Sequence, residues 1–509
     1  MIGSMDPRRP CEVVNAAMTA INSPILLDIA RDLRACRPDV VVLYIGNNEV
    51  VGPFGPGTIF SPLAGAARLA AFRVRLTRLR LVQLLSFRRS RTPRTWAGLD
   101  MFAGFHFPEG DPRLEPMYAA YRRNLESIVD ACRESGARVI LSTVAVNPAD
   151  CPPFGSEPPD ALPPAVRGQW QAAFDDGLAA QRKGDSEQAR AGFRNALALA
   201  DRHADLVFRL AQAERAAGNP PEARRLFRRA RDLDTQRFRA DRRINDIIRD
   251  VARNMEVQLV DAEAAFDAAS PASGVPGDEL FLDHVHFTFQ GTWHLAALFA
   301  NAILGTDAGE TPSPETCRHL MFFNPWAEAQ QASLMRKRRG QPPSLAQSGN
   351  DRQIARFYEI EARCAARMAE TPLPDLEREF LLLSAAAPRD FFLPFQWGAI
   401  LASRRRWTEA LPLLTTALRQ VPRHFEARVL PALALCHAGQ PAEAARLVLG
   451  PPGPHGRYLA ENALSVMRSL EGDGLLDEAR LFRTELLRLA PRFPLRPAIA
   501  SYPLGKSDG

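Results

Sequence analysis

The chain has 509 residues, of which 46% are hydrophobic and 24% are charged, and its formal net charge is +6. These values are those of a folded protein with several domains, and they exclude a chain that is disordered throughout. The sequence contains no apolar run of about 18 residues that could cross a bilayer, so we expect no membrane contact from this chain.

The charge pattern and the cysteine content argue against nucleic-acid binding, metal binding and a disulfide framework. Arginines and lysines are not gathered with aromatic residues on one predicted face, so we expect no nucleic-acid partner. The seven cysteines form no CxxC pair, which argues against a zinc site or a disulfide framework. We therefore expect neither a metal nor a cofactor.

The first predicted elements alternate between strands and helices. Residues 12–15 predict a short strand, and Ser23-Pro24 begins a predicted helix over 25–36. The run 39–45 is apolar without alternation, as in a strand that is covered on both faces. The later elements of this kind are a helix at 117–135, strands at 138–144 and 257–260, and a helix at 290–304. Strands that alternate with helices imply a parallel sheet.

One segment of the α/β part is rich in arginine. Eight arginines alternate with leucines between residues 73 and 94. We interpret this segment as the solvated face of a helix over a packed apolar stripe. The alternative is a basic amphipathic helix on an anionic membrane surface.

Internal repeats of 34 residues occur twice. The first set is Gly177, Gly184, Ala189, Phe193 and Ala196, which recur as Ala211, Gly218, Ala223, Phe227 and Ala230. The second set is Gly398, Arg405 and Ala410, and the equivalent positions 34 residues later are Ala432, Gly439 and Ala444. Small residues at helix contacts with this period resemble tetratricopeptide (TPR) repeats, which imply helical hairpins that bind a protein or peptide partner.

These patterns divide the chain into five consecutive segments, the first and third of which form one domain. The predicted parts are an α/β domain at 1–167 and 238–305, an inserted TPR pair at 168–237, a partly irregular linker at 306–375, and C-terminal TPR-like repeats at 376–495.

Three motifs carry candidate chemistry. Gly46-Asn47-Asn48 follows a predicted strand, where an Asn amide can donate to a developing oxyanion. Asp283 lies three residues before His286, so its carboxylate can orient that imidazole. The alternative is an Asp that caps the next helix beside surface histidines. At the end of the first predicted strand, the backbone N–H near Ala17 is a second candidate oxyanion donor.

Together these motifs resemble the SGNH/GDSL hydrolase family, whose GxN and DxxH blocks they match. The resemblance implies a flavodoxin-like αβα sandwich and a serine ester hydrolase that needs no metal. It implies that His286 is the general base, that Asp283 orients it, and that Asn48 and the Ala17 N–H bind the oxyanion of an ester substrate.

The family's GDS block, which supplies the nucleophilic serine on the first strand, has no counterpart in this sequence. Ser4 is the only nearby serine, and no predicted strand or helix holds it. We therefore expect that the sequence begins too late and lacks the first strand. The sequence does not fix the localisation: as it stands we expect the cytoplasm, and we expect the cell envelope if an N-terminal signal or anchor is missing. The alternative function is a non-catalytic TPR scaffold with a degenerate hydrolase domain.

Overall fold

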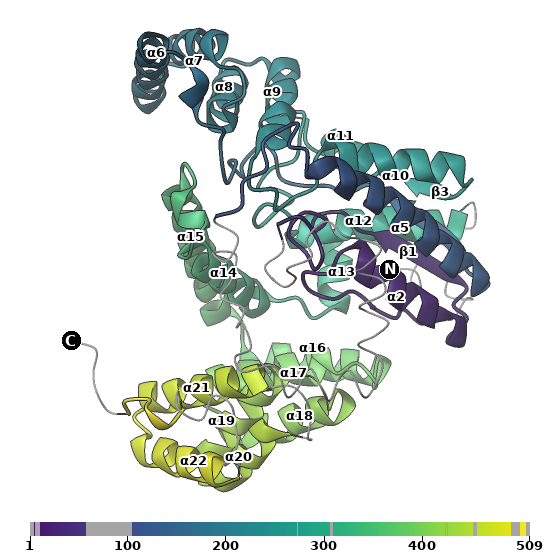
Figure 1. The fold of residues 1–509 in the computed structure, drawn as a ribbon. Helices are drawn as coiled ribbons and strands as arrows, with labels where there is room; N and C mark the ends of the chain where they lie inside the picture. The colour runs from purple at the N-terminus through teal and green to yellow at the C-terminus, as the bar shows by residue number, and fades with distance from the viewer. Residues whose placement is uncertain are drawn as a thin grey trace. The chain divides into compact units, whose positions relative to one another are not determined.

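A computed structural model describes most of the chain (Figure 1). The described residues are 5, 11–57, 104–271, 273–305, 309–422, 424, 426–450, 456–489 and 499–504. The arginine-rich segment 73–94 and Ser4 lie outside them. Contacts divide the chain into unit 1, which covers 1–317 and 332–358, and unit 2, which covers 318–331 and 359–509. Each unit has its own hydrophobic core.

Unit 1 contains a parallel sheet of three strands in the order β1-β2-β3. The strands are β1 (Val40–Tyr44), β2 (Arg138–Ser142) and β3 (Gln258–Val260). These are the strands predicted at 39–45, 138–144 and 257–260. The sheet is too small to establish the full flavodoxin-like αβα sandwich that we expected.

Helices cover both faces of this sheet. The helices of the α/β part are α2 (Ser23–Asp32), the short η1 (Leu33–Ala35), α5 (Leu114–Glu134), α10 (Arg242–Asn254), α11 (Ala262–Ala268) and α12 (Phe289–Leu304). Leu43 of β1 packs into the main core with α2, α5 and α10. Successive strand residues point to opposite faces of a sheet. The next residue, Tyr44, therefore points to the other face, and its ring lies 6.3 Å from the ring of Phe299 in α12.

The strand predicted at 12–15 is wrong, because residues 11–18 form neither strand nor helix. Val13 and Val14 are 77% and 78% exposed. In the described part of the chain β1 pairs with β2 alone, and residues 12–15 do not join it. A short apolar segment forms a strand only where a neighbouring backbone completes its hydrogen bonds.

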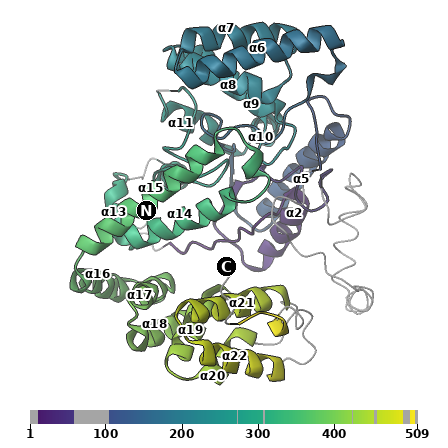
Figure 2. The ribbon, with the colours of Figure 1, turned by 90° about the vertical axis from the view of Figure 1, so that its left-hand side faces the viewer.

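The predicted insert between β2 and β3 is a stack of two helical hairpins (Figures 1 and 2). The short η3 (Pro159–Ala161) precedes α6 (Pro164–Lys183), α7 (Ser186–Leu199), α8 (Ala204–Ala216) and α9 (Pro220–Leu233). The Asp185 carboxylate accepts from the backbone N–H of Gln188 and caps α7. Phe193 and Phe227 are fully buried, one repeat apart, as their 34-residue spacing predicts.

The segment 306–375, predicted as a partly irregular linker, is largely helical in its described part. It contains α13 (Pro314–Leu320), α14 (Pro325–Arg339), η5 (Ser344–Ala346) and α15 (Asn350–Glu370). Its part in unit 1 is packed: Gln347 Nε2 donates to Pro152 O, and Gln353 Nε2 to Asp278 Oδ2, each at 2.7 Å. Pro312 and Pro342-Pro343 lie in the short segments before α13 and η5, whereas Pro314 begins α13.

The C-terminal repeats in unit 2 form a second helical stack. Its helices are α16 (Leu373–Ala386), α17 (Phe392–Ser403), α18 (Trp407–Gln420), η6 (Glu426–Arg428), α19 (Val429–His437), α20 (Pro441–Leu449), α21 (Gly456–Gly472) and α22 (Leu476–Leu489). The repeat positions Ala410, Ala432 and Ala444 are fully buried. This burial confirms the predicted repeat register.

Candidate functional site

The carboxyl ends of β1 and β2 meet the segment that carries Asp283 and His286. The backbone N–H of Asn147, in the loop after β2, donates to the carbonyl of His284 at 3.0 Å. The ring of Tyr44, the last residue of β1, lies 6.3 Å from the ring of Phe287. The loop after β1 and the segment 283–287, which are far apart in the sequence, therefore adjoin the same edge of the sheet.

Asp283 and His286 form a hydrogen-bonded pair. Asp283 Oδ2 lies 2.7 Å from His286 Nδ1, and Asp283 Oδ1 accepts from the backbone N–H groups of Val285 and His286 at 2.9 and 2.8 Å. Helix α12 is capped instead by Thr288, whose side chain accepts from the Gly291 N–H. The capping role considered for Asp283 is therefore wrong, and its carboxylate is hydrogen-bonded to the imidazole of His286 instead.

The two histidines beside Asp283 differ in exposure. His284 is buried, and burial lowers its pKa to about 4, so its ring is neutral at pH 7. Burial alone would raise the pKa of Asp283, but contacts with both histidines hold it well below its usual range. The His286 side chain is 49% exposed. An ionised carboxylate at Nδ1 leaves Nε2 of a neutral His286 as a proton acceptor at the surface.

The loop after β1 is fixed by its side chains. Asn48 Nδ2 donates to Ile21 O at 3.2 Å, and Asn47 Oδ1 accepts from the Ala240 N–H at 3.0 Å. A Cβ at Gly46 would lie 2.6 Å from Ile244 Cγ2, so only glycine fits at the start of this loop. In this loop the Asn48 amide therefore contacts the backbone of its own chain.

Ala17 does not offer the free backbone donor that we expected. Its N–H donates to its own neighbour, Asn15 Oδ1, at 2.9 Å, in an exposed turn. With no strand at 12–15, no described element holds this N–H at the sheet edge.

Glu49, which the sequence analysis did not single out, anchors this loop to the start of α2. Its carboxylate accepts from the Ser23 N–H at 2.8 Å and from Ser23 Oγ at 2.7 Å. The side chain is nearly inaccessible to solvent. Burial raises the pKa of Glu49 to about 7, and the two hydrogen bonds from Ser23 oppose this rise only in part.

We expect Glu49→Gln to remove a pH dependence of stability. Because the folded-state pKa lies above the unfolded value of 4.5, the stabilisation from Glu49 is complete below about pH 4.5 and is lost as the pH rises through about 7. The free energy of unfolding of the variant, relative to the parent, should therefore increase by up to about 3 kcal/mol over this range. Denaturant titrations at several pH values measure it. Parallel profiles for parent and variant would contradict the prediction, and the exposed Glu12→Gln is the matched control.

Asn245 is a second residue that the sequence analysis missed. Its amide accepts from the Val144 N–H at 2.8 Å and donates to the Val144 carbonyl at 3.0 Å. A side chain of α10 thus completes the backbone hydrogen bonds of the chain just after β2. The signal in the sequence is a polar residue beside the apolar stripe of Ile244, Ile247 and Ile248, all of them buried.

In the insert, α6 and α8 share a polar face. Gln181 Nε2 donates to Gln212 Oε1 at 3.1 Å, and Arg209 Nη1 donates to Gln181 Oε1 at 2.9 Å. We call the surface around Gln181, Arg209 and Gln212 the α6–α8 face. Amide and guanidinium groups lie side by side there, and such groups can hydrogen-bond to a peptide backbone.

Within the described residues, no group of three or more His, Cys, Asp or Glu side chains is placed to hold a metal ion. Over the same residues, every helix is too short or too polar to cross a bilayer.

Comparison with known proteins identifies the repeats. A family model described as "Tetratricopeptide repeat" matches residues 174–237 and 395–454. A solved structure entitled "Functional Characterization of Pseudomonas Aeruginosa pilF" is similar at 12% identity over 67% of this chain and 100% of that chain, with a TM-score of 0.17. Such a low score carries no argument about fold. No curated protein matches. The chain therefore contains TPR repeats in both helical stacks, whereas the comparisons give no support for a hydrolase domain.

Proposed function

We propose that this protein is a TPR scaffold that binds a protein or peptide partner through its helical hairpins. The observation that carries the proposal is the pair of TPR matches, at 174–237 and 395–454, on two stacks of packed hairpins. Hairpin stacks present extended surfaces that are suited to an elongated ligand. TPR repeats generally mediate protein–protein interaction.

The α6–α8 face is the surface on which we place the partner in unit 1. Gln181, Arg209 and Gln212 are only partly buried, so their remaining hydrogen-bonding capacity is accessible. A peptide backbone supplies the carbonyl and N–H groups that such side chains bind.

Site-specific photo-crosslinking tests this proposal. A benzophenone amino acid is placed at Gln212, on the α6–α8 face, and in a control at the exposed Ala191 of α7. After irradiation of cells of the source organism, we expect a discrete crosslinked protein from position 212 and none from position 191. The same adducts from both positions, or none from position 212, would refute the proposal.

A second candidate function, a serine ester hydrolase of SGNH/GDSL type, is favoured by the Asp283–His286 pair. In that mechanism His286 Nε2 would take the proton of an attacking serine hydroxyl, and Asp283 would stabilise the resulting imidazolium. Asn48 and the Ala17 N–H would bind the oxyanion of the ester.

The contacts of these residues make this candidate the weaker one. Among the described residues, no serine hydroxyl is hydrogen-bonded to His286. The donors of Asn48 and Ala17 each contact an oxygen of the chain itself. A general base without a nucleophile beside it has no proton to take.

A further inference from the structure

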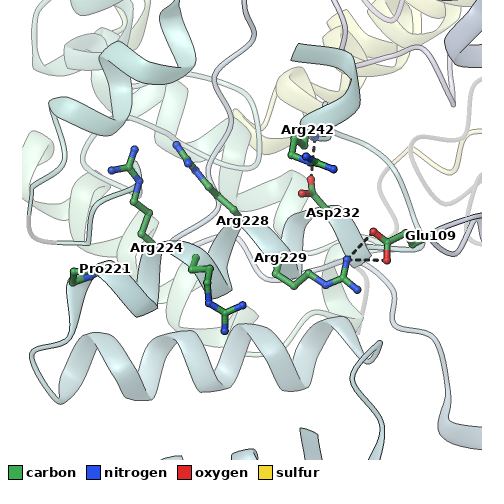
Figure 3. A pocket seen from close by; sticks show the side chains of 8 residues that line it. Glu109, Pro221, Arg224, Arg228, Arg229, Asp232 and Arg242 are labelled. Carbon is green, nitrogen blue, oxygen red and sulfur yellow. Dashed lines mark hydrogen bonds and ion pairs between the residues drawn. The ribbon is translucent and has the colours of Figure 1, made fainter. Parts of the chain in front are cut away.

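A cavity of about 420 Å³ lies between α9 of the insert and the α/β part of unit 1 (Figure 3). The residues that line it are Glu109, Pro221, Arg224, Arg225, Arg228, Arg229, Asp232 and Arg242. Arg224, Arg228 and Arg229 project from α9, whereas Arg242 is the first residue of α10. Five arginines and two carboxylates make this cavity strongly cationic.

Two of these arginines share one carboxylate oxygen. Arg224 Nη2 lies 3.2 Å from Asp267 Oδ2, and Arg228 Nη2 contacts the same oxygen. Asp267 is buried, and burial raises the pKa of this carboxyl above its usual value despite both guanidinium groups. One carboxylate thus serves two cations, which leaves a surplus positive charge at the wall of the cavity.

Arg242 adds a second, weakly compensated positive charge. Its side chain is 72% exposed, and its ion pair with Asp246 is long, at 4.0 Å. Asp232 on the cavity wall accepts from the backbone N–H of Arg242 at 3.0 Å, so the guanidinium is not engaged there.

The two remaining arginines of the cavity are each paired with a carboxylate. Arg229 Nη1 lies 2.7 and 2.8 Å from the two carboxylate oxygens of Glu109, and Arg225 forms a two-pronged pair with Glu222. The least compensated positive charge therefore lies on Arg224 and Arg228, which share Asp267, and on Arg242, whose pair with Asp246 is long.

We infer that this cavity binds the phosphate group of a small molecule. A phosphate monoester carries a charge between about −1.5 and −2 and three acceptor oxygens, which matches two surplus guanidinium groups. Arginine presents its N–H donors as a fork that fits phosphate oxygens in pairs. A volume of about 420 Å³ also leaves room for an organic group beside the phosphate, within the size range of small-molecule sites. This inference is independent of the protein partner proposed above.

Isothermal titration of the full chain with glucose 6-phosphate, and with glucose as the uncharged control, tests the inference. We expect saturable binding of the phosphate ester alone. The variant Arg242→Gln, which leaves no buried carboxylate unpaired, should weaken binding about tenfold. Arg224→Gln should do the same while Arg228 still pairs with Asp267.

The matched control removes a charge away from the cavity. Arg182→Gln, at an exposed position of α6 that does not line the cavity, should change the dissociation constant by less than about twofold, since exposed charges outside a site are screened by salt. Circular dichroism shows whether each variant is folded. Absence of saturable binding by the parent chain, or equal weakening by Arg182→Gln and Arg242→Gln, would overturn the inference and leave a solvated arginine cluster.

Discussion

Gly192→Ala is expected to destabilise the inserted hairpins by about 1–3 kcal/mol or more. A Cβ at position 192 would lie 2.6 Å from the backbone nitrogen of Gly177 and 2.8 Å from its Cα. Both contacts are with backbone, so a rotamer change cannot relieve them. Helices α6 and α7 would have to separate at the centre of their contact. Urea unfolding followed by circular dichroism measures the loss.

Gly168→Ala in α6 is the matched control for this prediction. A Cβ there meets no atom within 4 Å, so the substitution adds helix propensity without a clash. It should stabilise the insert by up to about 1 kcal/mol. If both alanine variants shift the unfolding midpoint in the same direction, the close approach of Gly177 and Gly192 is not real.

Asn245→Leu should cost about 2–6 kcal/mol of stability. Leucine fills a similar volume, but it leaves the N–H and the carbonyl of Val144 without the two hydrogen bonds that Asn245 supplies. Each unpaired buried backbone group costs about 1–3 kcal/mol. Thermal or urea unfolding of the variant against the parent gives this value.

The exposed Asn254, at the end of the same helix, provides the control. Asn254→Leu should change stability by no more than about 0.5 kcal/mol, as is usual for surface substitutions. Equal effects at positions 245 and 254 would show that the Asn245 amide does not complete the backbone after β2.

Much of the fold could be predicted because its signals are local. The apolar strands at β1 and β2 and the 34-residue spacing of Phe193 and Phe227 each follow from residues that lie close together or recur at a fixed period. The Asp283–His286 contact also follows from a spacing of three residues. Local spacing does not test a catalytic role, which depends on groups from elsewhere in the chain.

The failures concern residues whose state is decided by distant partners. Val13 and Val14 have strand-forming side chains, but they are exposed because no described backbone pairs with them. Prolines in 306–375 indicated a linker, whereas contacts such as Gln353 with Asp278 hold part of that segment on the core. The cavity beside α9 is lined by Glu109 as well, which is more than 100 residues away in the sequence, so the sequence does not reveal it.

Labelling with a fluorophosphonate probe tests most directly the claim that this protein is a scaffold and not a serine hydrolase. The probe forms a covalent bond with a serine whose proton is removed by a neighbouring base, whatever the natural ester. The intact mass of the treated chain should remain unchanged, as should that of His286→Ala. An adduct of one probe per chain that His286→Ala abolishes would contradict the scaffold account and establish a serine nucleophile beside His286.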